Sequence, residues 1–304
     1  MNGRQLTPAE LDRYSRHILL PQVGVEGQRR LSDSGALVVG AGGLGSAALA
    51  YLAAAGVGRL GIADGDRVEL SNLNRQVFYP LRAVGRPKAE AARDAVAALN
   101  PGCEVAVIGR RLTGENVRRA VRAWDVVLDC TDNFPARFLV SDACWLEKAP
   151  LVTAGILGFE GQLFTVLPGG ASPCYRCLIP EPPADLFAVP CGQAGVFGPA
   201  VGVLGTLQAV EAVKVLLGVG CGFERRLFVY DALKGRFRVI DRMADPACAL
   251  CGPRPTITDV VEYGVTRHAG SVCGPAGRRT PVQTPAKPAK RVKKSAPNRG
   301  RKGR

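Results

Sequence analysis

Short apolar runs alternate with longer segments of helical periodicity over the first half of the chain. The runs are four to six residues long, which is typical of strands buried on both faces of a parallel sheet. The segments between them predict helices that cover those faces. The strands expected here are 36–40, 59–64, 104–108, 126–129 and 151–154, and the helices are 47–56, 88–99, 115–123 and 136–147.

The pattern changes after Gly155. Residues 161–167 alternate as a strand, 199–217 predict one long apolar helix, and 226–241 predict a hairpin that turns near Lys234 and Gly235. Strands joined by a tight turn pair antiparallel. We therefore expect an α/β fold with a Rossmann-like, doubly wound, mainly parallel sheet that antiparallel strands extend.

An amphipathic segment opens the chain. Residues 6–19 predict a single helix, with Thr7 as N-cap, Pro8 in the first turn and Glu10 completing a capping box. We assign this helical segment, 1–33, to one domain that spans 1–255. Residues 256–304 are expected to form a C-terminal extension.

Charge is concentrated in that extension. The formal net charge is +14, but residues 267–304 hold 12 Lys or Arg and no acid, leaving 28 basic and 26 acidic residues in 1–266. A basic, proline-containing segment with little to bury predicts disorder from 267 onward. Nucleic acid is a candidate partner through this tail alone, and a solubilising extension is the alternative.

Two stretches resemble membrane spans by composition. The first, 34–58, contains seven glycines, and the second, 200–220, is interrupted by Gln208, Glu211 and Lys214. We expect both as buried parts of the core. The opening residues lack the apolar core of a secretory signal. The expectation is a cytoplasmic protein with no membrane partner.

A glycine-rich turn follows the first strand. Gly40, Gly42 and Gly45 have the G-x-G-x-x-G spacing, Gly43 lies among them, and Asp64 ends the second strand. Backbone N–H groups at such a turn bind phosphate, and the acid binds a ribose. The motif predicts a nucleotide site and leaves an NAD-dependent oxidoreductase open.

Further polar residues follow the second strand. Asp66, Asn72 and Arg75 come soon after it, and Lys88 begins the next helix. Hydride transfer has little use for added cations beside phosphates, whereas displacement at a phosphoryl centre needs them. These residues therefore favour nucleotide chemistry over an oxidoreductase.

Two aspartates close the fourth strand. Asp129 and Asp132 are expected at the carboxyl edge of the sheet, where the strands of a parallel sheet place their functional side chains. Carboxylate oxygens are ligands that Mg²⁺ prefers. The sequence predicts a magnesium ligand here.

Two cysteine pairs have metal-ligand spacing. They are Cys174 with Cys177 and Cys248 with Cys251, in a chain that has only two histidines. Four thiolates of this spacing predict a closed, structural Zn²⁺ site, with a redox-active pair as the alternative. Cys191 follows a proline-rich loop, and its context leaves a nucleophile and an ordinary loop residue both open.

These motifs stand in a fixed order along the chain. In sequence they are "GAGGLGS", "ADGDRVELSNLNRQ", "VGRPKAEAA", "DCTDN", "EGQ", the two CxxC pairs and "GVLGTLQAVEAVK". Together they resemble the ThiF/MoeB/HesA family, bacterial relatives of the ubiquitin-activating enzymes, over residues 6–252. The resemblance implies an adenylyltransferase: ATP and the C-terminal Gly-Gly carboxylate of a ubiquitin-like sulfur carrier give an acyl-adenylate and pyrophosphate. The acyl-adenylate then becomes a thiocarboxylate for thiamine or molybdopterin biosynthesis.

The resemblance also implies roles for the residues at the sheet edge. The glycine loop and Asp64 would hold the adenosine, Asn72, Arg75 and Lys88 the triphosphate, and Asp132 the Mg²⁺. A related branch of the fold activates a tRNA-bound carboxylate, and this substrate stays open as an alternative.

Two more residues match family positions. Arg16 matches an arginine that reaches the nucleotide site of the neighbouring subunit, which implies a homodimer. Cys191 matches a position at which some members form a thioester or persulfide with the carrier. The residues after Gly252 are expected to hold no sulfur-donor domain, so the donor would be a separate protein.

Overall fold

One sheet organises the described part of the chain, which comprises residues 5–169, 172–183, 195–220 and 222–263 of this computed structural model. Eight strands in these ranges take the order β3-β2-β1-β4-β5-β6-β7-β8. Strands β1 to β5 are parallel, and β6 to β8 pair antiparallel with their neighbours. The strands are β1 Gly35–Val39, β2 Arg59–Ala63, β3 Glu104–Ile108, β4 Val126–Asp129, β5 Leu151–Leu157, β6 Glu160–Val166, β7 Arg226–Asp231 and β8 Arg236–Asp241. The predicted fold class is confirmed.

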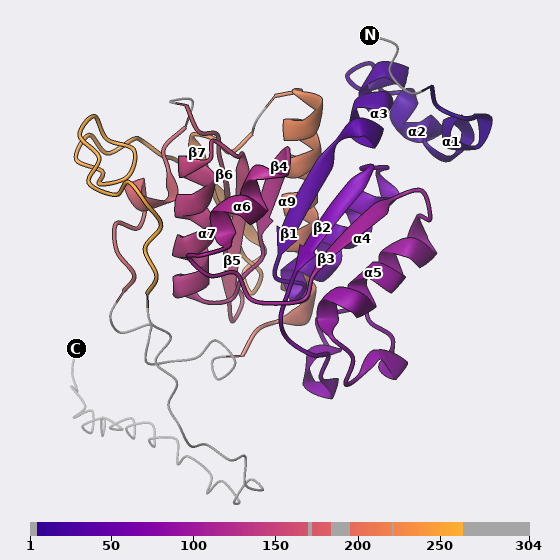
Figure 1. Cartoon of the computed structure of the whole chain (residues 1–304), viewed down its shortest axis with the longest axis horizontal. Coiled ribbons are helices and arrows are strands. Elements are labelled where there is room, and N and C mark those ends of the chain that lie inside the picture. Colours follow the sequence, from indigo (N-terminus) through magenta and orange to yellow (C-terminus); the bar gives the residue numbers. More distant parts are fainter. Residues whose placement is uncertain (1–4, 170–171, 184–194, 221, 264–304) are drawn as a thin grey trace, which may run out of the picture. The chain divides into compact units, whose positions relative to one another are not determined.

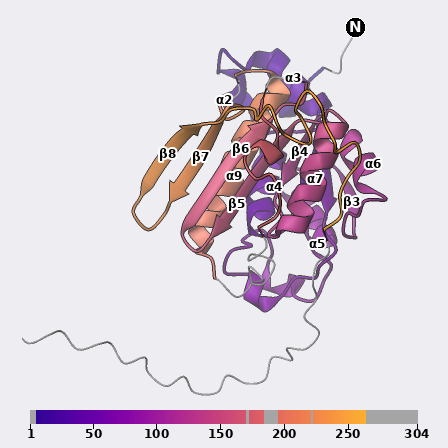
Figure 2. The same cartoon turned by 90° about the vertical axis from the view of Figure 1, so that its left-hand side faces the viewer.

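Helices cover both faces of this sheet (Figure 1). One face carries α4, α5 and α9, and the other carries α6 and α7. Alternate residues of β1 show the division, since Val38 packs under the first group and Leu37 under the second. The hairpin of β7 and β8 continues the sheet beyond the helices (Figure 2). The helices are α1 Pro8–Arg13, α2 Ser15–Ile18, α3 Gly24–Asp33, α4 Gly43–Ala54, α5 Lys88–Leu99, α6 Val117–Arg122, α7 Phe134–Leu146 and α9 Gly198–Leu217, with 3-10 turns η1 Leu70–Asn72, η2 Leu81–Ala83 and η3 Tyr175–Cys177.

The apolar helix α9 is a core element. Its length and mean hydropathy of 1.6 are those of a membrane span, yet 56% of its apolar window is buried inside the protein. Gln208 in its middle is fully buried and donates through Nε2 to the carbonyl oxygens of Asp129 at 2.8 Å and Val152 at 3.2 Å. These bonds tie α9 to the last residue of β4 and to the first part of β5.

The predicted N-terminal helix is interrupted. Thr7 and Glu10 form the expected capping box, but α1 ends at Arg13 and a separate turn, α2, begins at Ser15. Tyr14 between them turns inward, and its hydroxyl accepts a hydrogen bond from Asn100 Nδ2 at 2.9 Å. The prediction of one continuous helix over 6–19 is wrong because this distant contact fixes Tyr14 at the break.

The chain stays attached to the domain beyond residue 255. Asp259 Oδ1 accepts a hydrogen bond from Arg118 Nη1 on α6 at 3.1 Å. The Tyr263 ring lies edge-on to Phe138 of α7, with ring centroids 5.5 Å apart. Residues 256–263 are therefore anchored to α6 and α7. The predicted disordered tail from 267 lies outside the described residues.

Candidate functional site

The glycine turn joins β1 to α4 through two tight backbone approaches. Gly40 has φ +92°, and a Cβ there would lie 2.8 Å from the carbonyl oxygen of Cys130. A Cβ on Gly45 would collide with the carbonyl oxygen of Gly40. At Gly42 the nearest atom to an added Cβ is Gln76 Nε2, at 3.7 Å. The turn is thus closed towards the sheet at Gly40 and Gly45, and it has room only at Gly42, the N-cap of α4, where helix N–H groups can bind an anion.

Asp64 braces this turn from the end of β2. Its Oδ2 accepts a hydrogen bond from the Ala41 N–H at 2.8 Å, and its Oδ1 accepts one from the Asp66 N–H at 2.8 Å. Burial raises the pKa of Asp64, while these hydrogen bonds and the charge of Lys88 oppose the shift. Asp64 therefore stabilises the backbone of the glycine turn and of the segment after β2.

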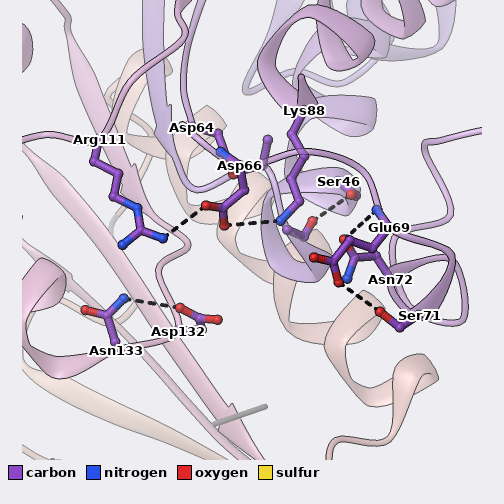
Figure 3. Close-up of polar contacts among 12 residues, drawn as sticks. Ser46, Asp64, Asp66, Glu69, Ser71, Asn72, Lys88, Arg111, Asp132 and Asn133 are labelled. Carbon is purple, nitrogen blue, oxygen red and sulfur yellow. Dashed lines mark hydrogen bonds and ion pairs between the residues drawn. The ribbon is translucent and has the colours of Figure 1, made fainter. Parts of the chain in front are cut away.

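Asp66 lies between two cations (Figure 3). Lys88 Nζ is 3.5 Å from Asp66 Oδ2, and Arg111 Nη2 donates to Asp66 Oδ1 at 3.1 Å. Burial acts to raise the pKa of Asp66, but the hydrogen bond from Arg111 and the charge of Lys88 outweigh it and lower the pKa. Lys88 is 8% exposed, so its charge acts in a partly desolvated environment.

Arg111 is a site residue that the sequence analysis missed. It follows β3, whose carboxyl end lies at the same edge as those of β1 and β2. No motif marks it. Arg111 could have been predicted from its position three residues after a parallel strand, because residues there lie at the carboxyl edge of the sheet.

Asn72 ends η1, and Arg75 lies in the segment that follows η1 and leads on to η2. Asn72 is buried, and its Oδ1 accepts from the Glu69 N–H at 3.2 Å. Arg75 Nη1 donates to the Ser71 carbonyl at 3.0 Å, and Arg75 Cγ would lie 3.5 Å from a Cβ placed on Gly43. Arg75 is thus beside the first turn of α4, whereas Asn72 shapes the loop that carries it.

The two aspartates after β4 differ in placement. Asp129 is fully buried, and its oxygens accept hydrogen bonds from Thr131 and Thr153. Asp132 is exposed, and its Oδ1 accepts from Asn133 Nδ2 at 3.2 Å. Both aspartates are at the carboxyl end of β4, as expected, since Asp129 is the last residue of that strand and Asp132 lies in the loop after it. The carboxylate of Asp129 is used for hydrogen bonds inside the protein, so Asp132 alone of the two faces outward as a candidate magnesium ligand.

The four expected zinc ligands converge. Their sulfur atoms all lie within 4.8 Å of one another, with Cys174 Sγ 3.5 Å from Cys248 Sγ and Cys177 Sγ 3.2 Å from Cys251 Sγ. Sulfurs of a tetrahedral zinc tetrathiolate are about 3.8 Å apart. The donor set and its spacing fit Zn²⁺.

A buried cation lies beneath this cysteine cluster. Arg242 donates through Nη2 to the carbonyl oxygens of Pro173 at 3.0 Å and Cys174 at 3.2 Å. Its guanidinium carbon is 3.9 Å from the centroid of the Phe164 ring. Burial lowers the pKa of Arg242 to about 10, and the charges of Cys177 and Cys174 oppose this shift.

Arg16 lies away from the glycine turn of its own chain. Arg16 is exposed on α2, next to Tyr14, which packs on Gly56 just past the end of α4. The 12-residue length of α4, about 18 Å, separates that end from the glycine turn. Cys191 lies outside the described residues.

Fold and site together define the class of nucleotide-binding α/β proteins. The family model described as "ThiF family" matches residues 14–250. The chain belongs to the ThiF family.

Individual relatives carry more specific names. The chain is 49% identical over 261 residues to the sulfur carrier protein adenylyltransferase of Thermus thermophilus, covering 84% of this chain and 96% of that protein. It is also 49% identical over 259 residues to the adenylyltransferase and sulfurtransferase MOCS3 of Bos taurus, covering 85% of this chain and 57% of that protein. The chain thus spans little more than half the length of its MOCS3 relatives.

A solved structure supports the fold at greater distance. It is the crystal structure of E. coli MccB with succinimide, with a TM-score of 0.69 and 21% sequence identity, over 79% of this chain and 73% of that chain.

Gly45→Ala tests the closure of the glycine turn. The added methyl group collides with a backbone carbonyl that cannot move without shifting β1, so we expect the free energy of unfolding to fall by about 3 kcal/mol or more. Gly202→Ala on α9 is the control, since nothing lies within 4 Å of its added Cβ. Urea denaturation of both variants measures the difference, and equal stabilities would contradict the close approach.

Metal analysis tests the cysteine cluster. We expect about one zinc per chain in the purified protein and its loss in Cys248→Ser, with a lower melting temperature, because a closed zinc site contributes folding energy. Cys103→Ser, a buried cysteine outside the cluster, should keep the metal. Full zinc content in Cys248→Ser would refute the ligand set.

Proposed function

We propose that this protein adenylates the C-terminal Gly-Gly carboxylate of a ubiquitin-like sulfur carrier. A carboxylate oxygen attacks the α-phosphorus of ATP, the bond to the bridging oxygen breaks, and pyrophosphate leaves with that oxygen. The observation that carries the proposal is the pair of cations near the glycine turn. Arg75 lies beside the start of α4, and Lys88 is buried near Asp64, whose carboxylate holds the loop. The names of the close relatives point to the same reaction.

Each residue of the site has a task in this reaction. The glycine loop and Asp64 bind the adenosine, with Asp66 orienting Lys88 from the side. Arg75 and Lys88 stabilise the negative charge that builds up on the phosphates, an effect that grows where water is excluded. Asn72 supports the loop that presents Arg75. Asp132 is the exposed carboxylate that holds Mg²⁺, which neutralises phosphate charge when bound.

The cysteine cluster holds a structural zinc ion in this proposal. All four ligands are protein thiolates, so no position is open for water or substrate. The ion joins η3 to the segment after β8, which lie about 70 residues apart in the sequence.

The working enzyme in this proposal is a cytoplasmic homodimer. Arg16 lies at the far end of α4 from its own glycine turn, so it serves the partner subunit's site. Cys191 forms a covalent bond with the activated carrier, and sulfur comes from a separate donor protein. Carriers of thiamine and of molybdopterin biosynthesis are both candidates.

ATP–pyrophosphate exchange with purified carriers tests the reaction. Exchange should require one particular carrier, and the identity of that carrier distinguishes the thiamine pathway from the molybdopterin pathway. The exchange rate should fall at least about 100-fold in Lys88→Ala and in Asp132→Ala. Arg93→Ala, also on α5 but paired with Asp94 at the surface, should keep the wild-type rate. Exchange that survives both site changes would refute the assigned roles. Exchange supported by tRNA and by no carrier would replace the substrate.

Mixing two inactive variants tests the shared site. Arg16→Ala and Lys88→Ala should each be inactive, but random reassembly of the two should restore about a quarter of wild-type exchange, because each mixed dimer has one complete site. Lys88→Ala mixed with Asp132→Ala is the control and should stay inactive, because every site in its mixed dimer carries one of the two changes. If Arg16 serves its own subunit, the first mixture stays inactive as well.

A further inference from the structure

The loop between β4 and α7 carries Asp132 and is held from its buried side. Asp129 precedes the loop and is fully buried. Its Oδ1 accepts hydrogen bonds from the N–H of Thr131 at 3.0 Å and from Thr131 Oγ1 at 2.6 Å. Its Oδ2 accepts one from Thr153 Oγ1 on β5 at 2.8 Å. Asp129 therefore fixes the backbone one residue before Asp132.

Arg137 in the first turn of α7 holds the same loop. Its Nη2 donates to the carbonyl oxygen of Thr131 at 2.7 Å, and its Nε lies 3.8 Å from Asp129 Oδ2. The residue is 9% exposed. Gly155 on β5 provides the room, since a Cβ there would collide with Arg137 Nη1. The fold thus reserves a buried place for this guanidinium beneath the loop.

Helix α7 is itself fixed by the cysteine-bearing turn. Arg176, between Cys174 and Cys177, binds Asp142 of α7 with two hydrogen bonds of 2.8 and 2.7 Å. Its guanidinium carbon lies 4.8 Å from the centroid of the Phe138 ring. The helix that carries Arg137 is therefore anchored to the cysteine cluster by a buried ion pair and a stacked ring.

We propose that Arg137 is a positioning residue for Asp132: it bridges Asp129 and the Thr131 carbonyl, and so sets the direction in which the Asp132 carboxylate meets a nucleotide-bound divalent cation. This inference rests on the proposed function, in which Asp132 binds Mg²⁺. Arg137 is too deeply buried to act as an exposed ligand for phosphate.

The chemistry of Mg²⁺ makes such positioning matter. The ion demands near-octahedral geometry with short oxygen distances, so a carboxylate that drifts loses affinity steeply. Groups that orient a metal ligand typically contribute about 10- to 100-fold to metal affinity. Lysine at 137 would keep the charge but could not reach both oxygens, because it lacks the planar fork of arginine.

Divalent-cation binding to the full-length protein tests the role without any carrier. Free Mn²⁺ is measured by electron paramagnetic resonance in the presence of α,β-methylene-ATP, a non-cleavable nucleotide. Arg137→Lys should raise the dissociation constant for Mn²⁺ by about tenfold or more. In the exchange assay the Mg²⁺ concentration for half-maximal rate should rise in parallel, while the affinity for the metal-free nucleotide stays unchanged.

Two further variants complete the design. Thr153→Val removes one hydrogen bond to Asp129 without touching Arg137, and should weaken Mn²⁺ binding in the same direction even if Arg137→Lys folds poorly. Arg122→Lys is the control and should leave Mn²⁺ binding unchanged. Arg122 is an exposed residue at the end of α6, and it pairs with Glu147 at the C-terminal end of α7, away from the loop that carries Asp132.

The outcomes separate this inference from the proposed function. Wild-type Mn²⁺ affinity in folded Arg137→Lys and in Thr153→Val overturns the positioning role alone. Absence of nucleotide-dependent Mn²⁺ binding in the unaltered protein overturns the assignment of Asp132 and the positioning role with it. Weaker metal binding in both variants but not in Arg122→Lys supports the inference.

Discussion

The site depends on the parallel pairing of β1 to β5. Parallel strands bring their carboxyl ends to one edge, so residues that follow different strands become neighbours although they are far apart in sequence. Arg111 meets Asp66 across 45 residues in this way. The glycine turn brings the backbone N–H groups at the start of α4 to the same edge, and it can do so only because α4 approaches β1 without an intervening side chain. Antiparallel strands β6 to β8 extend the sheet and contribute none of these groups.

Local patterns account for most of what the sequence predicted correctly. Apolar runs and glycine turns are short-range signals, so the strands, the helices and their order could be inferred without knowledge of contacts. The expected family is confirmed by the match over residues 14–250. The convergence of the two cysteine pairs was also predictable, since two pairs of this spacing in one chain favour a shared metal ion over a redox-active pair.

The errors arise where a distant contact decides the outcome. The break at Tyr14 depends on Asn100, which lies 86 residues away. Asp129 and Asp132 look alike in the sequence, and only the partners Thr153 and Arg137 make one of them internal. Arg111 has no motif, so its contact with Asp66 becomes visible only when strands β2 and β3 are paired. Roles for the individual site residues remain predictions that the experiments above address.

Arg242 gives the cysteine cluster a property that spacing alone does not reveal. Four thiolates around Zn²⁺ carry a net charge of about −2, and a buried guanidinium bonded to backbone carbonyls beneath them offsets part of it. The metal ion and the arginine therefore both offset the negative charge of the same four thiolates inside the protein. Protonation of the thiols after metal loss would leave the cation isolated in a medium of low polarity, which is costly. Demetallation and local unfolding around β8 should consequently proceed as one cooperative event rather than as two separable steps.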